Sequence, residues 1–124
     1  MELDATRPVP LAAQKQAQIQ IDKFNQLNWR EPAEFYGTLT TLEDGPAWQP
    51  GWIGGGMSSY ALLRLGGELE ETRAIKTLEH LFRTQTPSGF FWESTDETGL
   101  AGHSFHPPYA KDWHLLRKSG DVLY

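Results

Sequence analysis

The sequence predicts an all-α fold in which helical hairpins are joined by long irregular loops. Two helical segments, residues 57–65 and 68–84, are separated by only two glycines. A third segment, residues 10–29, carries apolar side chains at helical spacing. The remaining long segments, residues 31–56 and 85–113, show no strong helical period and are rich in Gly and Pro.

The first helix is predicted for residues 10–29. Pro10 suits the first helical turn, where the N–H that proline lacks has no partner within the helix. Pro32 disfavours helical backbone in the residue before it and ends this region. One apolar stripe runs along the helix: Ala13, Ala17, Ile21, Phe24 and Leu27.

Residues 31–56 contain local signals for strands and turns. Residues 35–41 are aromatic or β-branched at most positions, and residues 43–46 form a turn sequence, so a short β-hairpin is allowed here. The glycines at 54–56 precede a helix start, a place where backbone N–H groups can bind an anion. No Gly-Lys-Ser/Thr follows them, so close helix packing is the expected reason for these glycines.

The two central helices differ in their apolar patterns. Apolar side chains surround residues 57–65, which predicts a helix that is buried on all sides. Residues 68–84 carry a single stripe, which predicts a helix that faces solvent on the other side. The stripe consists of Leu69, Thr72, Ile75, Leu78, Leu81 and Phe82. The charged and polar face includes Glu70, Glu71, Arg73, Lys76, Glu79, His80 and Arg83.

A fourth helix is expected to begin near Asp121, which leaves it only the four residues 121–124. Such a helix is too short to be stable, so we expect a truncated chain. Loops longer than about 12–15 residues are uncommon in compact domains unless they have a function. The two irregular segments are therefore the expected location of the site.

This succession of a buried helix, a half-exposed helix and a long loop resembles the α/α toroid. The motif Gln-x3-Gly-x2-Trp, at residues 85–92, resembles the turn from an outer to an inner helix in that fold, and residues 116–124 resemble the start of another inner helix in six-hairpin glycosidase-like proteins. The resemblance covers residues 48–124. It implies that residues 1–124 form a single domain, a piece of a larger toroid, with residues 1–9 as a flexible N-terminal segment.

Other toroid families fit less well. The same motif is similar to the repeat of squalene-type cyclases, but the chain has no Asp-x-Asp-Asp sequence. Prenyltransferase and lanthionine-cyclase toroids use a zinc site with cysteine, and this chain has no cysteine.

The resemblance implies glycoside hydrolase-like chemistry, which needs two carboxyl groups that flank the scissile bond. The loop acids Glu93, Asp96, Glu97, Asp112 and Asp121 are the candidates, and Glu93, Asp96 and Asp121 are the expected catalytic set. Glu93 follows two aromatic residues, which suits a general acid because apolar surroundings raise the pKa of a carboxyl group. Asp121 at a helix start suits a base. The simpler roles are a solvated loop acid for Glu93 and a helix cap for Asp121.

Aromatic residues in the loops are the expected saccharide-binding groups. The substrate-binding set is Trp48, Trp52, Trp92, Trp113, His106 and Tyr109. Aromatic faces stack on sugar rings, and polar groups bind sugar hydroxyls. The alternative is that these aromatic side chains only anchor the loops by packing.

The histidines suggest two further hypotheses. His103, His106, Asp112 and His114 form a cluster of metal-binding residue types, but the spacing fits no strict template, and neither a metal site nor a cofactor is predicted. A uronate lyase-like toroid would use His103, His106 and Tyr109 as base and acid.

Composition limits the partners. A net charge of −5 with scattered basic residues argues against nucleic acid. No apolar run approaches the roughly 18 residues of a membrane span, and the N-terminus lacks a signal peptide, so the cytoplasm is the default location. The alternative to a saccharide-binding enzyme is a non-catalytic helical module that self-associates or binds a protein, because residues 57–65 are apolar all round.

Overall fold

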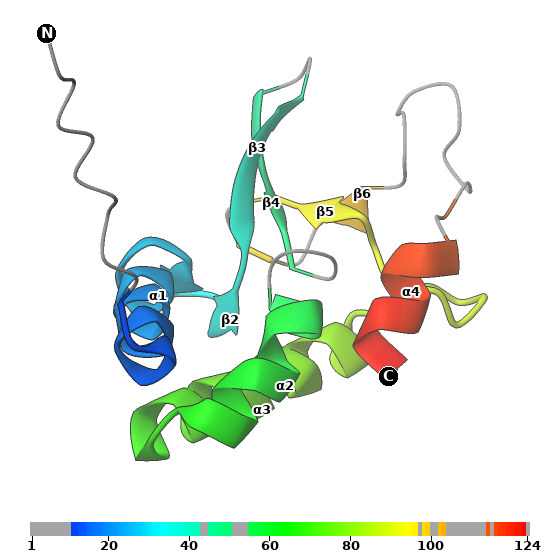
Figure 1. Cartoon of the computed structure of the whole chain (residues 1–124). Coiled ribbons are helices and arrows are strands. Elements are labelled where there is room, and N and C mark those ends of the chain that lie inside the picture. Colours follow the sequence, from blue (N-terminus) through cyan, green and yellow to red (C-terminus); the bar gives the residue numbers. More distant parts are fainter. Residues whose placement is uncertain are drawn as a thin grey trace, which may run out of the picture.

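The computed structural model describes residues 11–42, 45–50, 55–96, 98–99, 102–103, 114 and 116–123. In these residues the elements are α1 (Ala13–Leu27), β1 (Trp29–Arg30), β2 (Phe35–Tyr36), β3 (Thr38–Leu42), β4 (Gly45–Gln49), α2 (Gly55–Leu65), α3 (Glu68–Arg83), β5 (Ser94–Thr95), β6 (Gly102–His103) and α4 (Leu116–Leu123). Figure 1 shows α2 and α3 as a hairpin, with α1 near one end and α4 near the other.

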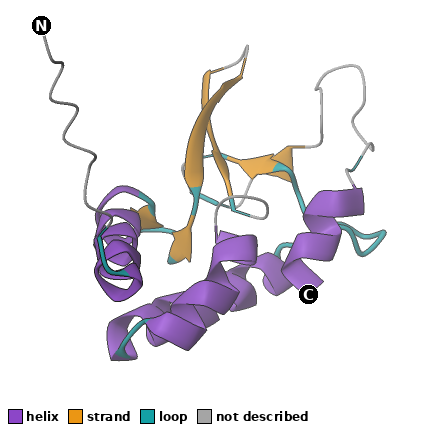
Figure 2. Ribbon diagram, in the orientation of Figure 1, coloured by secondary structure: helices purple, strands orange, loops and turns teal. Residues whose placement is uncertain are grey.

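The strands form two antiparallel sheets, so the prediction of an all-α, α/α-toroid type of fold is wrong. The first sheet contains β1 and β2, and the second has the order β3-β4-β5-β6. Figure 2 shows the strands gathered on one side of the helical hairpin. The β-hairpin that the sequence allowed is confirmed as β3 and β4. The other strands have two residues each, too few for a sequence period, and the link from β4 to β5 pairs Trp48 with the distant Thr95.

Strand β2 supplies both main hydrophobic clusters. Phe35 and Tyr36 are completely buried. Successive residues of a strand point to opposite sides, so each ring enters a different cluster. The first cluster contains Tyr36, Ile21, Leu62 and Ala74, and the second contains Phe35, Ala33 and Trp48. This dipeptide therefore joins the helices to the larger sheet.

Thr77 of α3 fastens β2 to the helical hairpin. Its hydroxyl accepts a hydrogen bond from the amide N–H of Tyr36 at 2.9 Å and donates one to the carbonyl of Arg73 at 2.8 Å. A Cβ atom added at Gly55 would overlap Cγ2 of Thr77 and would lie 2.8 Å from the carbonyl oxygen of Tyr36. Close packing is thus confirmed as the reason for glycine at position 55.

Asn25 connects α1 to the same junction. Its Nδ2 donates to Oε1 of Glu70 at 2.5 Å. Its Oδ1 accepts hydrogen bonds from Nη1 of Arg73, at 3.1 Å, and from the hydroxyl of Tyr36. Ile21 is the one buried residue of α1, and this amide group adds polar contacts to the attachment of the helix.

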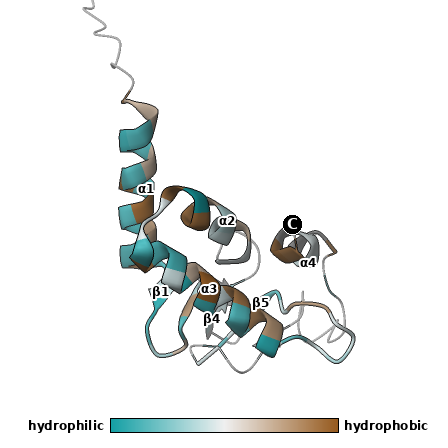
Figure 3. Cartoon of the chain, turned by 90° about the horizontal axis from the view of Figure 1, so that it is seen from below, coloured by the Kyte–Doolittle hydropathy of each residue, from teal (hydrophilic) through white to brown (hydrophobic). Residues whose placement is uncertain are grey.

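Helix α2 is half exposed, so the prediction of burial on all sides is wrong. Its buried residues are Gly55, Gly56, Ser59 and Leu62. Its exposed apolar side chains are Met57, Tyr60, Leu63 and Leu65. Figure 3 shows hydrophobic residues along α2 and α3 in the view from below. The described elements pack against only one face of α2, where small residues allow close contact.

The apolar stripe predicted for α3 is also only partly correct. Leu81 is buried as expected, whereas Leu69, Ile75 and Phe82 are about half exposed. The buried face consists of Ala74, Thr77, His80 and Leu81. This face is rotated from the predicted stripe because α3 packs against β2 as well as against α2.

Helix α4 begins at Leu116 and has eight residues, so the predicted start near Asp121 is wrong. Asp121 lies in its last turn, where the negative end of the helix dipole disfavours a carboxylate. Val122 packs with Leu81 and Phe91 in a third cluster, which links α4 to the end of α3.

The two glycines at positions 55 and 120 form a matched test of this packing. Gly55→Ala is expected to lower the free energy of unfolding by about 1–3 kcal/mol, because Thr77 and the backbone of Tyr36 occupy the space. Gly120→Ala is expected to raise it by about 0.5–1 kcal/mol, since no atom lies within 4 Å of the new Cβ in an exposed helix. Urea denaturation measures both. A Gly55→Ala variant as stable as the wild type would contradict the packing described.

Candidate functional site

A groove of about 350 Å³ lies between the turn that follows α3 and His114, two residues before α4. It is lined by Thr86, Pro87, Ser88, Phe90, Trp92 and His114. No lining residue carries a permanent charge. We call this feature the aromatic groove.

The Gln-x3-Gly-x2-Trp motif builds one wall of the aromatic groove. Gly89 has a φ of 86°, a conformation that L side chains rarely adopt, and its N–H donates to the carbonyl of Thr86 at 2.9 Å. Nε2 of Gln85 donates to the carbonyl of Gly89 at 3.0 Å. The Thr86 hydroxyl accepts from the N–H of Phe90 at 3.1 Å. The Gln85 amide, the Thr86 hydroxyl and the positive φ of Gly89 thus close the turn that presents Phe90 and Trp92.

The aromatic residues alternate between core and groove. Phe91 is buried against Leu81 and Val122, and its N–H donates to Oγ of Ser119 at 3.2 Å. The flanking Phe90 and Trp92 are half-buried and line the groove.

Strand β6 supports the Trp92 ring from outside the groove. A Cβ atom added at Gly102 would overlap that ring. Glycine at this position therefore allows the indole to lie directly against the backbone of β6.

Glu93 and His114 form a buried pair behind this wall. Oε2 of Glu93 lies 3.5 Å from Nδ1 of His114, and the two side chains are 4% and 6% exposed. The rings of Phe90 and His114 are almost parallel, with centroids 5.4 Å apart, and the Trp92 ring is tilted against His114 at 5.5 Å. An imidazole thus lines the groove while a carboxylate stands behind it.

The other residues of the predicted catalytic set lie elsewhere or are not placed. Asp96 is half-buried, and its Oδ1 accepts from the Thr98 hydroxyl at 2.7 Å. Asp121 belongs to α4, but its side chain is not described. Glu97 and Asp112 lie outside the described residues.

The predicted substrate-binding residues divide in the same way. Trp92 lines the aromatic groove, whereas Trp48 is in the core at 8% exposure with the guanidinium of Arg30 3.7 Å above its ring. The other four, Trp52, Trp113, His106 and Tyr109, lie outside the described residues.

His114 is a groove residue that the sequence suggested only as one member of a loose metal cluster. Among the residues that the structure describes, no three His, Asp or Glu side chains are grouped closely enough to hold a metal ion. The position of His114 beside Glu93 had no signal in the sequence, since 21 positions separate the two residues.

His80 is a second residue that the sequence misplaced. It was expected on the charged face of α3, but it is 1% exposed and stacks on Phe35 with ring centroids 4.6 Å apart. Nη2 of Arg83 lies 3.4 Å from its Nδ1. Burial, with a smaller effect from the Arg83 charge, lowers the pKa of His80 to about 4. The sequence did contain a signal for the burial of His80, because this residue shares helical spacing with Ala74, Thr77 and Leu81.

Comparison with models of protein families, with curated proteins and with solved structures finds no match to this chain. In the part of the chain that the structure describes, no helix combines the length and apolar character needed to cross a membrane.

The buried His80 predicts a loss of stability in mild acid. Its folded-state pKa of about 4 lies below the ordinary value of 6.5, so the unfolded chain binds a proton more readily between these values. The contribution of His80 to the free energy of unfolding is fully retained above pH 6.5. It falls by on the order of 2–3 kcal/mol as the pH drops toward 4.

Urea denaturation at pH 7 and pH 5 tests this effect, with His80→Leu as the variant that cannot titrate. The wild type is expected to lose more stability than the variant over this interval. Equal losses in both proteins would show that His80 is not the group responsible.

Proposed function

We propose that this chain binds a saccharide in the aromatic groove as part of a glycoside hydrolase-like protein. The observation that carries the proposal is the combination of two aromatic side chains, two hydroxyl groups and a buried carboxylate–imidazole pair around one groove.

The shape and lining of the groove suit a sugar ring. Its volume of about 350 Å³ is in the range typical of small-molecule sites, about 300–1,000 Å³. Phe90 and Trp92 offer apolar faces for stacking on the C–H groups of a sugar. The hydroxyls of Thr86 and Ser88, 2.9 Å from each other, can donate to or accept from sugar hydroxyls.

Hydrolysis of a glycosidic bond would place further demands on the site. Two carboxyl groups must lie about 5–9.5 Å apart, on either side of the bond. Of the predicted catalytic acids, Glu93 stands behind the groove wall, and none of Glu93, Asp96 and Asp121 is among the residues that line the groove. Saccharide binding is therefore the part of the proposal to test first.

Isothermal titration with cellotetraose, xylotetraose and tetragalacturonate tests this binding. We expect at least one of them to bind, and Trp92→Ala to weaken its affinity by at least about tenfold through loss of the stacking surface. Tyr60→Ala is the control, because Tyr60 is 67% exposed on α2 and does not line the groove. If the three saccharides fail to bind, or if Trp92→Ala leaves their affinity unchanged, the proposal is wrong.

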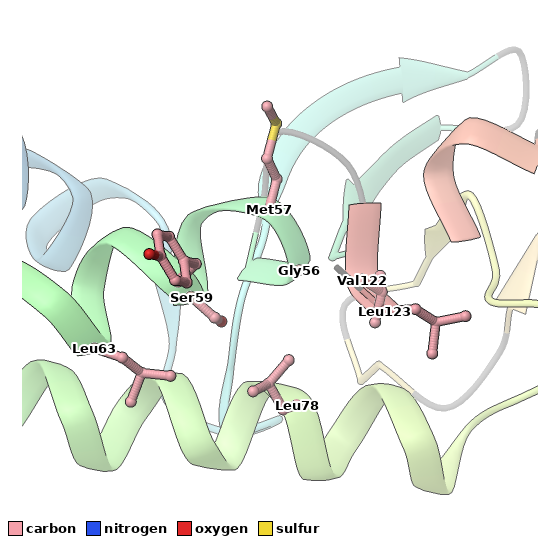
Figure 4. Close-up of a pocket in the computed structure, with 8 residues that line it drawn as sticks. Gly56, Met57, Ser59, Leu63, Leu78, Val122 and Leu123 are labelled. Carbon is pink, nitrogen blue, oxygen red and sulfur yellow. The ribbon is translucent and has the colours of Figure 1, made fainter. Parts of the chain in front are cut away.

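Self-association is the second candidate function, and the exposed face of α2 favours it. Met57, Tyr60, Leu63 and Leu123 are 49%, 67%, 41% and 67% exposed, and we call them the α2 patch. They border a groove of about 440 Å³ between α2, α3 and α4 (Figure 4). Leu78 of α3 and Val122 of α4 also line this groove. Contiguous exposed apolar surface of this kind marks interaction sites.

The α2 patch predicts a concentration-dependent dimer. Tyr60→Lys is expected to shift the protein toward monomer, because a charge replaces apolar surface at the contact, with little effect on stability at this exposed position. Leu69→Lys on α3 is the control, since Leu69 is 53% exposed but lies outside the patch. Sedimentation velocity over a range of concentrations measures the change. A wild type that is monomeric at every concentration would exclude self-association through this face.

A further inference from the structure

Strand β3 is the longer of the two edges of the larger sheet. The sheet has the order β3-β4-β5-β6, so β3 and β6 lie at its edges. Strand β6 has two residues, whereas β3 has five. Figure 1 shows the β3–β4 hairpin extending away from the helices, with β3 on the side opposite β5. Every second residue of an edge strand turns its N–H and C=O groups away from the sheet, where a further strand can bind them.

The described part of the chain leaves most of this edge open. At the start of β3, Nδ2 of Asn28 donates to the carbonyl of Gly37 at 3.1 Å and to the Thr38 hydroxyl at 3.4 Å. From Leu39 to Leu42, the described residues make backbone hydrogen bonds to β3 only within its ladder with β4. The open part of the edge is therefore residues 39–42.

Pro46 of β4 indicates which residues of β3 face outward. Thr41 pairs with Pro46, and Leu39 pairs with Trp48. Because proline has no N–H, Thr41 and Pro46 cannot exchange the two hydrogen bonds of a hydrogen-bonded pair. The two kinds of pair alternate along an antiparallel ladder, so Leu39 and Trp48 form a non-hydrogen-bonded pair as well. The N–H and C=O groups of Leu39 and Thr41 therefore point to the open edge, while those of Trp48 point to β5, with which Trp48 pairs.

Strand β3 has none of the features that commonly prevent edge strands from pairing. Its sequence, Thr-Leu-Thr-Thr-Leu, contains no charged residue and no proline. Its register with β4 skips no residue, so the strand has no β-bulge. A second copy of the same strand fits this edge, because a two-fold axis places the donors of an antiparallel edge opposite its own acceptors. An uncharged strand also brings no like charges face to face when it pairs with itself.

We propose that β3 pairs with β3 of a second copy of this chain in an antiparallel arrangement that joins the two larger sheets. A two-fold axis beside Thr40 gives the longest overlap, with Leu39 opposite Thr41 of the second copy. Thr40 then lies opposite its own equivalent in a non-hydrogen-bonded pair, with Cα atoms about 4.5 Å apart. A contact of a few hydrogen bonds and small area is weak, so the pairing is expected at high protein concentration. It does not depend on saccharide binding and uses a surface other than the α2 patch.

Single cysteine substitutions test this register, because the chain contains no cysteine. Thr40→Cys is expected to form a disulfide between copies, since the Cα atoms of such a pair lie within disulfide range. Thr72→Cys is the matched control at an exposed position of α3. Under mild oxidation, Thr40→Cys is expected to cross-link at least about tenfold faster than Thr72→Cys, because pairing raises the effective concentration of the thiols. Leu39→Cys is expected to cross-link more slowly than Thr40→Cys, because the two copies of position 39 are displaced from each other along the strands.

A second substitution tests the backbone contact. Thr41→Pro removes an N–H that faces the second copy, and proline is tolerated on the open side of an edge strand. Combined with Thr40→Cys, it is expected to slow the cross-linking to the rate of Thr72→Cys. Tyr60→Lys, which alters the α2 patch, is expected to preserve the cross-linking of Thr40→Cys. Far-UV circular dichroism checks that each variant is folded.

The proposal fails if Thr40→Cys and Thr72→Cys cross-link at the same rate, or if Leu39→Cys cross-links faster than Thr40→Cys. It also fails if a folded Thr41→Pro variant cross-links as fast as its parent. If Tyr60→Lys abolishes the cross-linking, the copies meet through the α2 patch and the contact assigned to β3 is wrong. If Thr41→Pro does not fold, the rates of the three single-cysteine variants decide the question.

Discussion

The structure depends on two adjacent side chains that must be buried on opposite sides of one short strand. Phe35 and Tyr36 are both completely buried, and each belongs to a different cluster. Strand β2 stays in place because the Thr77 hydroxyl accepts a hydrogen bond from the Tyr36 N–H. In addition, Gly55 lets the start of α2 lie close to Thr77 and Tyr36. Any shift of β2 by one residue would exchange the two rings between the clusters. The helices and the larger sheet are therefore positioned by the same dipeptide.

This constraint extends along α3 to the aromatic groove. The buried face of α3 continues from Thr77 to Leu81, which packs on Phe91 and Val122. Phe91 inside the core leaves its neighbours Phe90 and Trp92 on the groove side, because the direction of side chains alternates in extended chain. Glu93 then leads into β5, which is paired to the rest of the sheet. The aromatic groove is thus supported by α3, by the larger sheet and by α4.

Sequence patterns located the helices better than the sheets. The periodicity of residues 10–29, 57–65 and 68–84 corresponds to α1, α2 and α3 with small differences at the ends. The β3–β4 hairpin was visible because its partners are neighbours in the chain. The pairing of Trp48 with Thr95 was not, since it joins distant residues in strands too short for a period. Apolar residues alone also misassigned α2, because Gly55, Gly56 and Ser59 form much of its buried face and its larger residues face outward. Trp92 was predicted as a substrate-binding residue and does line the groove, whereas the pairing of Glu93 with His114 depends on tertiary structure.

The most direct measurement is chemical-shift mapping by NMR with cellotetraose or xylotetraose added to the whole chain. Saccharide binding in the aromatic groove predicts changes at the indole N–H of Trp92 and at the backbone amides of Ser88, Gly89 and Phe90. The amides of Tyr60 and Leu63 on α2 are expected to stay unchanged. If Trp92 does not respond while the α2 amides do, the groove is not the saccharide site and the account of its function is contradicted.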